Sequence, residues 1–279
     1  MEQNETTGKV WFIGAGPGDP ELLTVKGRRL IRQASLVLYA GSLVPPAVVA
    51  EARPEARLID SAPLHLEETH TLMREAARRG ETVARVHTGD PGLYGALREQ
   101  AALLARDNIP YEVVPGVSAA FAAAAAAGLS LTVPEKTQCF SITRLAGRTP
   151  VPAGQGVREL AAHGGSLAVY LSGADRRQLA RELRAAGLPG GTAIVAAYRV
   201  GWPEERLIRL NLAELDPDGL ELEPEAAARL DGQLGELDKL ARQITFLVLP
   251  GESGTDGTPP SRLYDRNFSH GFRAAQDKK

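Results

Sequence analysis

The stretch VWFIGAGPGDPELLTVKG, residues Val10–Gly27, decides the fold class of this chain. A hydrophobic run, Val10–Ile13, ends in a turn rich in glycine and proline, and a helical pattern over Leu22–Ala34 follows. A strand, a tight turn and a helix in this order are typical of a parallel α/β sheet. What such a turn holds depends on its individual residues.

The turn departs from the dinucleotide-binding fingerprint. Gly14 and Gly16 occupy its first and third positions, but Asp19 stands at the sixth, where the fingerprint has glycine. A carboxylate there competes with a pyrophosphate for the amides of the helix N-terminus. The next apolar run, Leu36–Tyr39, ends without the carboxylate that binds a ribose, and no phosphate-binding P-loop pattern occurs. A pyrophosphate cofactor is therefore disfavoured, and Asp19 is expected to cap the helix with Pro20 at its first position.

Two later turns share this character. His87–Gly95, HTGDPGLYG, repeats the Gly-Asp-Pro tripeptide after an expected strand, and Val114–Ala119 reads VPGVSA. The carboxyl ends of strands in a doubly wound sheet face one crevice, where ligands bind. Neutral backbone with one or two carboxylates suits a cationic or zwitterionic nucleoside better than a polyphosphate. The alternative is that each turn merely connects a strand to a helix.

The rest of the chain alternates short apolar runs with helical patterns, which predicts an α/β fold throughout. We expect further strands at Leu36–Tyr39, Thr82–His87, Tyr111–Val114, Gln138–Thr143, Leu167–Leu171, Ala193–Ala197, Leu207–Leu212 and Ile244–Leu249. We expect further helices at Leu66–Arg79, Leu93–Arg106, Ala119–Ala127, Val157–Ala162, Arg176–Ala186 and Pro224–Ala241. The short Gly-Trp-Pro link before Leu207 suits a hairpin, so a mixed sheet is expected in the second half. The expected domains are residues 8–117 and 118–251, followed by a tail, 252–279.

Composition limits the function classes. The chain has 279 residues and a net charge of −2, which gives no general reason to expect nucleic acid or an anionic membrane as partner. The single Cys139 excludes an internal disulfide, and no cluster has metal-ligand spacing, so no metal is expected. The longest apolar stretch, Ala119–Leu131, is shorter than the roughly 18 residues of a membrane span, and the polar, acidic N-terminus resembles no targeting peptide. We expect a cytoplasmic protein.

Five stretches in order resemble the tetrapyrrole methylases, which transfer a methyl group from S-adenosylmethionine. They are GAGPGDPELLTVKG, LYAGSLV, HTGDPGLYGA, EVVPGVSA and AYRVGWPEER. Three further stretches, APLHLEE, TRLAGRTPVP and RVGWPEER, resemble the subgroup that methylates carbon 11 of precorrin-4 in cobalamin biosynthesis. The resemblance implies two αβα domains in the class III methyltransferase fold, the cofactor in the interdomain cleft, and a homodimer. Methylation of another ring position, or of uroporphyrinogen III, remains an alternative; a non-catalytic nucleotide-binding domain is a more distant one.

The resemblance also implies which residues bind the methyl donor. The positions that match the family's donor-binding loops are Pro17, Gly89, Asp90, Leu93, Ser118, Ala119, Leu171, Tyr198 and Val200. A substrate with many carboxylate arms needs cations, and the candidates are Arg85, Arg144 and Arg148, with His65 as a further substrate-binding candidate. Each arginine could equally form an ion pair within the fold, and a lone histidine is more often a satisfied polar residue than a base. No pattern identifies a general base, so no catalytic residue is assigned.

Two C-terminal segments carry no assigned role. Glu214–Lys239 is acidic and longer than the subgroup leads us to expect, with Leu230, Leu234 and Leu237 at helical spacing. This spacing predicts a surface helix that packs one leucine stripe. The closing SRLYDRNFSHGFR, residues 261–273, is rich in aromatic side chains and resembles the corresponding stretch of some family members.

Overall fold

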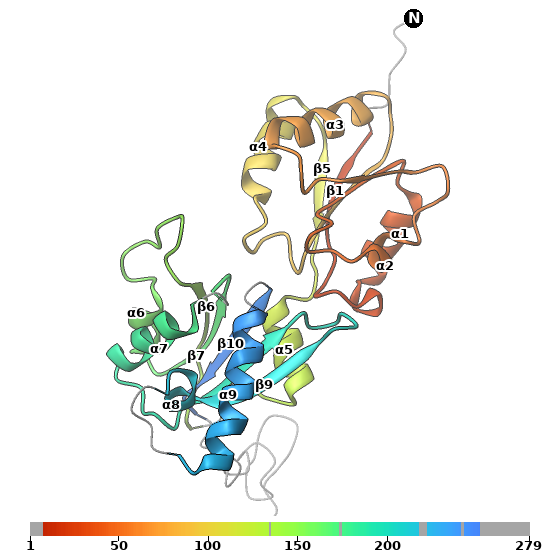
Figure 1. Ribbon diagram of the computed structural model, residues 1–279. Coiled ribbons are helices and arrows are strands. Elements are labelled where there is room, and N and C mark those ends of the chain that lie inside the picture. The colour runs from red at the N-terminus through yellow and green to blue at the C-terminus, as the bar shows by residue number, and fades with distance from the viewer. Residues whose placement is uncertain (1–7, 134, 173–174, 218–221, 241–242, 252–279) are drawn as a thin grey trace, which may run out of the picture. The chain divides into compact units, whose positions relative to one another are not determined.

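The computed structural model describes residues 8–133, 135–172, 175–217, 222–240 and 243–251, which form two compact units (Figure 1). The first unit holds the described residues up to Ala122 together with Arg199–Glu205. The second holds Ala123–Tyr198 and the described residues from Arg206 onward. The division falls inside helix α5 (Ala119–Ala127). No helix in these ranges is both long and apolar enough to cross a membrane. The C-terminal aromatic stretch lies outside the described residues.

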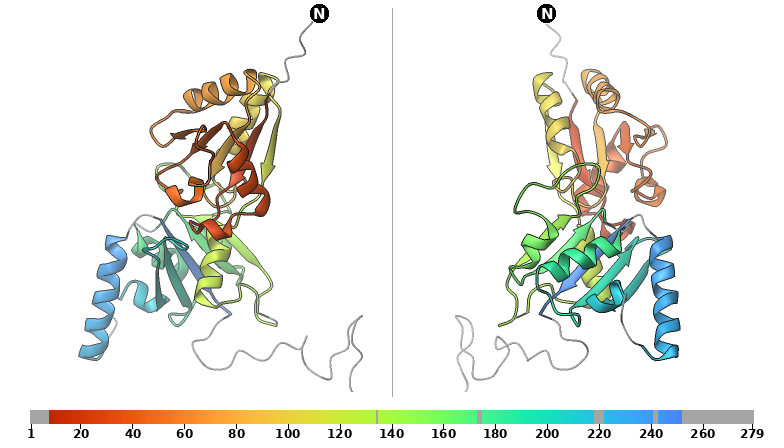
Figure 2. Two further views of the ribbon diagram at one scale, coloured as in Figure 1. Left: turned by 90° about the vertical axis from the view of Figure 1, so that its right-hand side faces the viewer. Right: turned by 60° about the vertical axis from the view of Figure 1, so that its left-hand side comes forward.

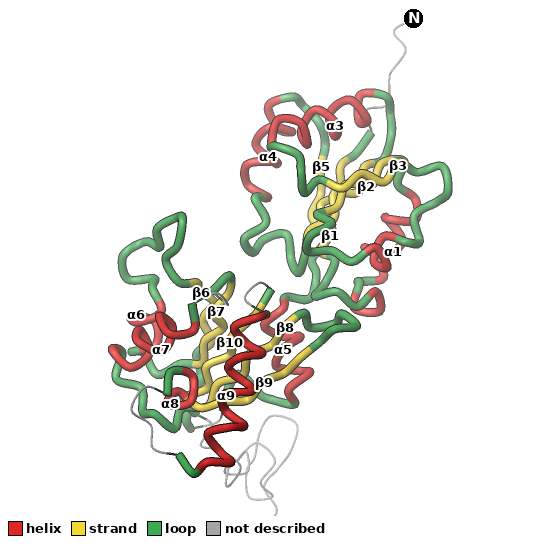
Figure 3. The backbone as a smooth tube through the Cα atoms, in the orientation of Figure 1, coloured by secondary structure: helices red, strands yellow, loops and turns green. Residues whose placement is uncertain are grey.

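The first unit is a parallel sheet with the strand order β3-β2-β4-β1-β5. Its strands are β1 (Val10–Gly14), β2 (Leu36–Tyr39), β3 (Arg57–Asp60), β4 (Val83–His87) and β5 (Tyr111–Val114). Its helices are α1 (Val25–Gln33), α2 (Pro46–Val49), α3 (Leu66–Arg78) and α4 (Leu97–Arg106). Because β1 lies between β4 and β5, the carboxyl ends of these three strands are neighbours at the point where the strand order reverses (Figure 3). A doubly wound sheet binds ligands at this point.

Successive side chains of a strand point to opposite faces of the sheet, so each strand contributes to a core on both faces. Ile13 and Val37 pack with α1 and α2, whereas Phe12 and Leu38 pack with α3 and α4. A parallel strand buried on both faces needs a continuous hydrophobic run, and β1 and β2 supply one. The doubly wound α/β expectation is confirmed for this unit.

Two helices begin later than the sequence predicts. Asp19 caps only a short 3-10 turn, Pro20–Leu22, where its Oδ1 accepts a hydrogen bond from the amide of Glu21 at 2.8 Å. Helix α1 begins at Val25, with Thr24 as its cap. The helix expected from Leu93 begins at Leu97, since the residues before it form a strained turn. The prediction also missed β3 and α2, which are too short for a periodic pattern to reveal.

A buried polar contact joins α3 to the end of α4. The Nε2 atom of His70 lies 2.7 Å from Oδ2 of Asp107, and Nε of Arg106 donates to the same carboxylate at 3.2 Å. The hydrogen bond from His70, with a smaller contribution from Arg106, lowers the pKa of Asp107 to about 2. A carboxylate whose pKa is lower in the folded state stabilises the fold above its unfolded-state pKa.

Asp107→Asn should therefore cost stability at neutral pH and progressively less in acid. The difference in free energy of unfolding between wild type and variant should be constant above about pH 4, the ordinary range of an aspartate, and shrink as the pH falls through 4 towards about 2. Urea unfolding of both proteins across this range measures the difference. A gap between the two proteins that does not change with pH would contradict the assigned role of the carboxylate.

The second unit is a mixed sheet with the order β6-β7-β10-β8-β9, which confirms the expected hairpin topology. Its strands are β6 (Phe140–Arg144), β7 (Ser166–Tyr170), β8 (Ala193–Tyr198), β9 (Arg206–Asn211) and β10 (Ile244–Leu249). Its other helices are α6 (Val157–Ala161), α7 (Arg176–Ala185), α8 (Leu212–Leu215) and α9 (Pro224–Lys239). Strand β6 is parallel to β7, and β10 is antiparallel to both β7 and β8. Strands β6, β7 and β8 therefore end at the same edge of the sheet.

Residues Pro224–Lys239 of the acidic segment form helix α9, which runs along the outside of this unit (Figure 2). Leu230, Leu234 and Leu237 are buried against the core, as the spacing predicts. Arg176 of α7 anchors the helix end, because its guanidinium donates to both carboxylate oxygens of Asp238 at 2.8 and 3.1 Å. The prediction of a surface helix with one leucine stripe is confirmed.

Candidate functional site

The three turns at the carboxyl ends of β1, β4 and β5 are in direct backbone contact. Gly16 and Gly89 exchange two hydrogen bonds, from the Gly89 amide to the Gly16 carbonyl at 2.8 Å and back at 3.2 Å. The Ala15 amide also donates to the His87 carbonyl at 2.7 Å. The two Gly-Asp-Pro turns, far apart in the sequence, thus extend the pairing of β1 with β4. The expectation that these turns meet at the carboxyl ends of neighbouring strands is confirmed, and the ligand crevice stays a prediction.

Glycine is required where the three turns meet. A Cβ atom on Gly14 would lie 2.5 Å from the Cα atom of Gly116, and one on Gly116 would lie 2.7 Å from the Cα atom of Gly14. A Cβ on Gly116 would also overlap the carbonyl oxygen of Gly89. All of these neighbours are backbone atoms, which cannot turn aside as a side chain can. The lining at this point is therefore bare main chain.

Asp90 joins the second turn to the third. Its Oδ1 accepts from the Gly92 amide at 2.8 Å, which closes the turn, and its Oδ2 accepts from the Gly116 amide at 2.9 Å. The carboxylate is thus held by two backbone donors at known positions. We infer that Asp90 fixes the distance between the two loops.

The second turn stores backbone strain. Tyr94 and Ala96 have φ angles of +55° and +51°, in the left-handed region that side chains other than glycine rarely adopt. Gly95 between them fits closely, because a Cβ there would lie 3.0 Å from Nδ1 of His87. Tyr94 is 51 % exposed despite its size. Strain of this kind concentrates at functional sites, and it explains why α4 begins only after Ala96.

The remaining donor-site candidates of the first unit lie in or beside these turns. Pro17 is buried in the first turn, Ser118 is buried at the start of α5, and Ala119 and Leu93 are half-buried. The Cα atom of Ser118 would lie 3.8 Å from a Cβ on Gly89. Val200 is buried in the segment Arg199–Glu205 of the same unit. Their roles in binding remain predictions.

Arg85 and His87 lie on β4 just before the second turn. Arg85 donates to Oε1 of Gln100 at 2.9 Å and to Oγ of Ser61 at 2.8 Å, and no ion pair involves it among the described residues. Burial lowers its pKa to about 10, so it stays charged at neutral pH. Burial, and the charge of Arg85, lower the pKa of His87 to about 3. His87 is therefore neutral at physiological pH, and its buried Nε2 has no hydrogen-bond partner among the described residues.

The other candidates of the second unit lie at one edge of its sheet. Arg144 ends β6, Leu171 follows β7 and Tyr198 ends β8. Leu171 has a φ of +56° and is 76 % exposed, a costly arrangement for a large apolar residue. The roles of Leu171 and Tyr198 in donor binding remain predictions.

The guanidinium of Arg144 organises the loop that carries Arg148. It donates to the carbonyls of Leu145, Thr149 and Pro150 at 3.2, 3.0 and 2.8 Å. These partners are neutral, so the positive charge of Arg144 is not cancelled by a carboxylate in these contacts. Arg148 itself is exposed. The role of Arg144 seen in the structure is to shape the loop.

His65 has a local structural role. Its amide donates to Oε2 of Glu68 at 2.8 Å, at the first turn of α3, and its side chain is exposed. Among the described residues, no group of three or more histidine, cysteine, aspartate or glutamate side chains could hold a metal ion. The hydrogen bond to Glu68 is made by the backbone, so the role of the His65 side chain in substrate binding remains a prediction.

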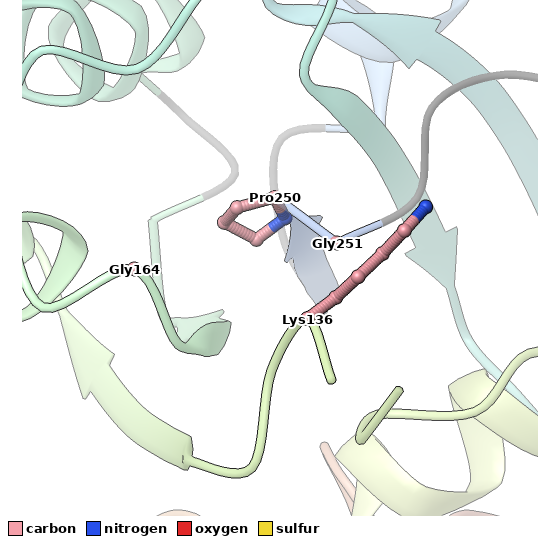
Figure 4. A pocket seen from close by; sticks show the side chains of 4 residues that line it. All are labelled: Lys136, Gly164, Pro250 and Gly251. Atoms are coloured by element: carbon pink, nitrogen blue, oxygen red, sulfur yellow. The ribbon is translucent and has the colours of Figure 1, made fainter. Parts of the chain in front are cut away.

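Two hollows occur in the second unit. One, of about 380 Å³, is lined by Lys136, Gly164, Pro250 and Gly251 (Figure 4). Lys136 extends away from the Pro250 ring there. The other, of about 220 Å³, lies beside Arg144 and the loop that this residue organises. Only the second hollow adjoins residues singled out by the sequence.

The three turns of the first unit fit S-adenosylmethionine better than a phosphorylated cofactor. The stretches 14–20, 88–95 and 115–119 contain no lysine or arginine, so these loops offer a polyphosphate no cation. They do carry the carboxylates of Asp19 and Asp90. A positively charged sulfonium nucleoside is favoured beside such groups, and a phosphate is repelled.

Sequence reasoning missed one residue at these turns. Nε1 of Trp202 donates a hydrogen bond to the carbonyl of Pro17 at 3.1 Å. The stretch around Trp202 predicted a hairpin and resembled the family, but it assigned Trp202 no role, because a contact over such a sequence separation leaves no local signal.

Comparison with known proteins agrees with this site. Residues 9–216 match the family model of the tetrapyrrole (corrin/porphyrin) methylases. The chain is 42 % identical to a cobalt-precorrin-4 C(11)-methyltransferase of Priestia megaterium, over 95 % of this chain and 97 % of that protein. It is also 42 % identical to a precorrin-4 C(11)-methyltransferase of Pseudomonas aeruginosa, over 96 % and 99 %.

Solved structures give the same result. The X-ray structure of a cobalt precorrin-4 methyltransferase, CbiF, aligns with a TM-score of 0.77 and 41 % identity, covering 86 % of this chain and 94 % of that one. A uroporphyrin-III C-methyltransferase of Thermus thermophilus, complexed with S-adenosylhomocysteine, aligns with a TM-score of 0.68 and 27 % identity, covering 91 % and 97 %. On its sequence and its fold, the chain belongs to the tetrapyrrole (corrin/porphyrin) methylases.

Proposed function

We propose that this chain transfers the methyl group of S-adenosylmethionine to carbon 11 of precorrin-4 or cobalt-precorrin-4. The observation that carries the proposal is the match to relatives named for this reaction, which covers nearly the whole of both chains. The three-turn site in the first unit supports it, because its loops contain two carboxylates and no lysine or arginine, which suits the cationic methyl donor. Methylation at another ring carbon remains the alternative, since a structure named for uroporphyrin-III also aligns.

Methyl transfer from a sulfonium to carbon depends mainly on alignment and needs little help from acidic or basic side chains. S-adenosylmethionine supplies an electrophilic methyl group on a sulfonium, and its carbon–sulfur bond breaks as the new carbon–carbon bond forms. Alignment of two reactants can lower a barrier by about 7–11 kcal/mol in well-oriented models. The chain's part is to hold the donor in the turns joined by Asp90 and to exclude water. His87 is neutral and deeply buried, so it acts as a packing group beneath Gly95 and not as a charged acid.

The carboxylate arms of the tetrapyrrole need cations, and Arg148 is exposed on the loop that Arg144 holds. Arg85 is buried, and its guanidinium already donates to Gln100, Ser61 and the carbonyl of Leu38. A guanidinium binds a carboxylate with two parallel hydrogen bonds. We assign Arg148 to substrate binding, Arg144 to positioning of the loop, and Arg85 to the contact of β4 with α4.

Arg148→Gln should raise the KM for the tetrapyrrole about 10-fold, since a hydrogen bond to a charged group contributes about 1.5–3 kcal/mol. The affinity for S-adenosylhomocysteine should stay unchanged. Steady-state kinetics at saturating methyl donor measures the effect. Arg181→Gln, on the exposed side of α7, is the charge-matched control and should leave the KM within two-fold of wild type. If Arg148→Gln and Arg181→Gln raised the KM equally, the effect would come from the change in net charge and not from a contact of Arg148 with the substrate.

The reaction is tested by incubating purified protein with S-adenosylmethionine and three separate acceptors. Precorrin-4 and cobalt-precorrin-4 should each be examined for the addition of one methyl mass, and uroporphyrinogen III serves as the competing acceptor. Methylation of either precorrin, with none of uroporphyrinogen III, is the expected result. Methylation of uroporphyrinogen III alone would replace the proposal with its alternative.

Assembly and location are part of the same proposal. We propose a cytoplasmic homodimer, as the family resemblance implies. Light scattering coupled to size-exclusion chromatography tests the assembly, and twice the mass of one chain is the expected result. A single-chain mass over the working concentration range would contradict it.

A further inference from the structure

The segment Arg199–Glu205 carries an indole onto the first turn. In the sequence it continues at both ends into β8 and β9, yet it belongs to the first compact unit. Its Trp202 is half-buried, and Nε1 of the indole donates to the carbonyl of Pro17 at 3.1 Å. Pro17 lies directly beside Gly16, which pairs with Gly89 of the second turn. The contact therefore acts on the turn that forms one wall of the proposed donor site.

The first turn is shaped to receive this indole. Gly18 has a φ of +151°, and a Cβ on it would overlap Cδ1 and Nε1 of Trp202 and lie 3.1 Å from Cγ. Only a residue without a side chain leaves room for the indole at this point of the backbone. The glycine of the Pro-Gly-Asp stretch is thus explained by Trp202 and not by a phosphate.

The segment is itself preorganised. The Gly201 amide donates to Oε2 of Glu205 at 2.8 Å, which closes the turn. Gly201 has a φ of +81°, and a Cβ there would lie 2.8 Å from the Asp19 amide nitrogen. The guanidinium carbon of Arg199 lies 4.8 Å from the centre of the Trp202 ring, in a cation–π contact. The indole is therefore held from both sides before any ligand binds.

We propose that Trp202 is a positioning residue for the methyl donor. Its indole holds Pro17 and Gly18 in the conformation in which Gly16 can pair with Gly89, so the donor meets a preformed wall. A preformed site spends less of its binding free energy on ordering. The inference rests on the proposed function, because it assigns the three turns to S-adenosylmethionine.

Trp202→Phe tests the hydrogen bond. Loss of one neutral hydrogen bond of about 0.5–1.5 kcal/mol corresponds to about a 2- to 12-fold change. The Kd for S-adenosylhomocysteine, measured by calorimetry, should rise by about this factor, and Trp202→Ala should raise it further. The KM for the tetrapyrrole and the kcat at saturating donor should not change. Trp11→Phe, the other tryptophan of the chain, is the matched control and should leave the Kd within two-fold.

A double-mutant cycle separates positioning from general damage. Gly18→Ala should weaken donor binding strongly in the wild-type background, because its Cβ collides with the indole. In the Trp202→Ala background the same substitution should cost markedly less, since the collision is gone. The backbone strain of alanine at this φ is present in both backgrounds and cancels.

The outcomes distinguish this inference from the proposed function. If wild-type protein binds no S-adenosylhomocysteine, the proposed function fails. If wild type binds it and Trp202→Phe, Trp202→Ala and Gly18→Ala all bind equally well, the inference alone fails. Additive effects in the cycle, or losses of donor affinity matched by equal losses in tetrapyrrole KM and free energy of unfolding, would also overturn it.

Discussion

Gly116→Ala is expected to lower the affinity for S-adenosylhomocysteine by up to about 100-fold, because about 1–3 kcal/mol of overpacking strain falls on the loops proposed to bind it. The new Cβ would overlap the Gly89 carbonyl and lie 2.7 Å from the Cα atom of Gly14, so two loops must separate. Overpacking of this kind costs about 1–3 kcal/mol of stability. Calorimetry and urea unfolding measure the two effects.

The matched control for this substitution is Gly191→Ala. A Cβ at Gly191 would meet no atom within 4 Å, so its free energy of unfolding should stay within about 0.5 kcal/mol of wild type. Donor affinity should also be unchanged in this control. If Gly116→Ala bound S-adenosylhomocysteine as tightly as Gly191→Ala, the three turns could not be the donor site.

Asp90→Ala is expected to weaken both donor binding and stability. It removes the acceptors of the exposed Gly92 amide and the half-buried Gly116 amide, and a typical hydrogen bond contributes about 0.5–1.5 kcal/mol. We expect the Kd for S-adenosylhomocysteine to rise about 10-fold or more, since the loop separation is no longer fixed. Asp90→Asn should be similarly impaired, because one orientation of its amide presents a donor to the Gly116 amide and the other presents it to Gly92.

Asn211→Ala is the control for loss of a polar cap. Oδ1 of Asn211 accepts from the Glu214 amide at 2.9 Å at the start of α8. Its loss should lower stability by about 1 kcal/mol and leave donor affinity intact. If Asp90→Ala likewise lost stability alone, Asp90 would be a structural cap with no part in binding.

The part of the site that could be predicted from sequence is the part formed by short turn motifs. Gly14 and Gly116 are glycines because main chains cross there, and Gly89 adopts a φ of +59°. Each lies within a short motif at the end of an apolar run. Parallel strands then place the three turns together without further information. For this reason the proximity of the three turns was predictable although the strand order was not.

The details that the sequence did not reveal depend on tertiary contacts. Helix α4 begins late because Tyr94 and Ala96 adopt left-handed backbone, which a helical pattern over Leu93–Arg106 cannot show. Trp202 meets Pro17 across 185 residues, so a single sequence contains no sign of the contact. The assignment of Arg144 to the substrate changed for the same reason, since its three carbonyl partners become visible only when the loop is folded.

The most direct test of the central claim is the position of the transferred methyl group. The protein should be incubated with S-adenosylmethionine labelled with carbon-13 in its methyl group, with precorrin-4 and, in parallel, with cobalt-precorrin-4. The product is then mapped by nuclear magnetic resonance. A single new labelled methyl group on carbon 11 is the predicted result. A labelled methyl on any other ring carbon, or no transfer to either acceptor by protein that binds the donor, would contradict the account.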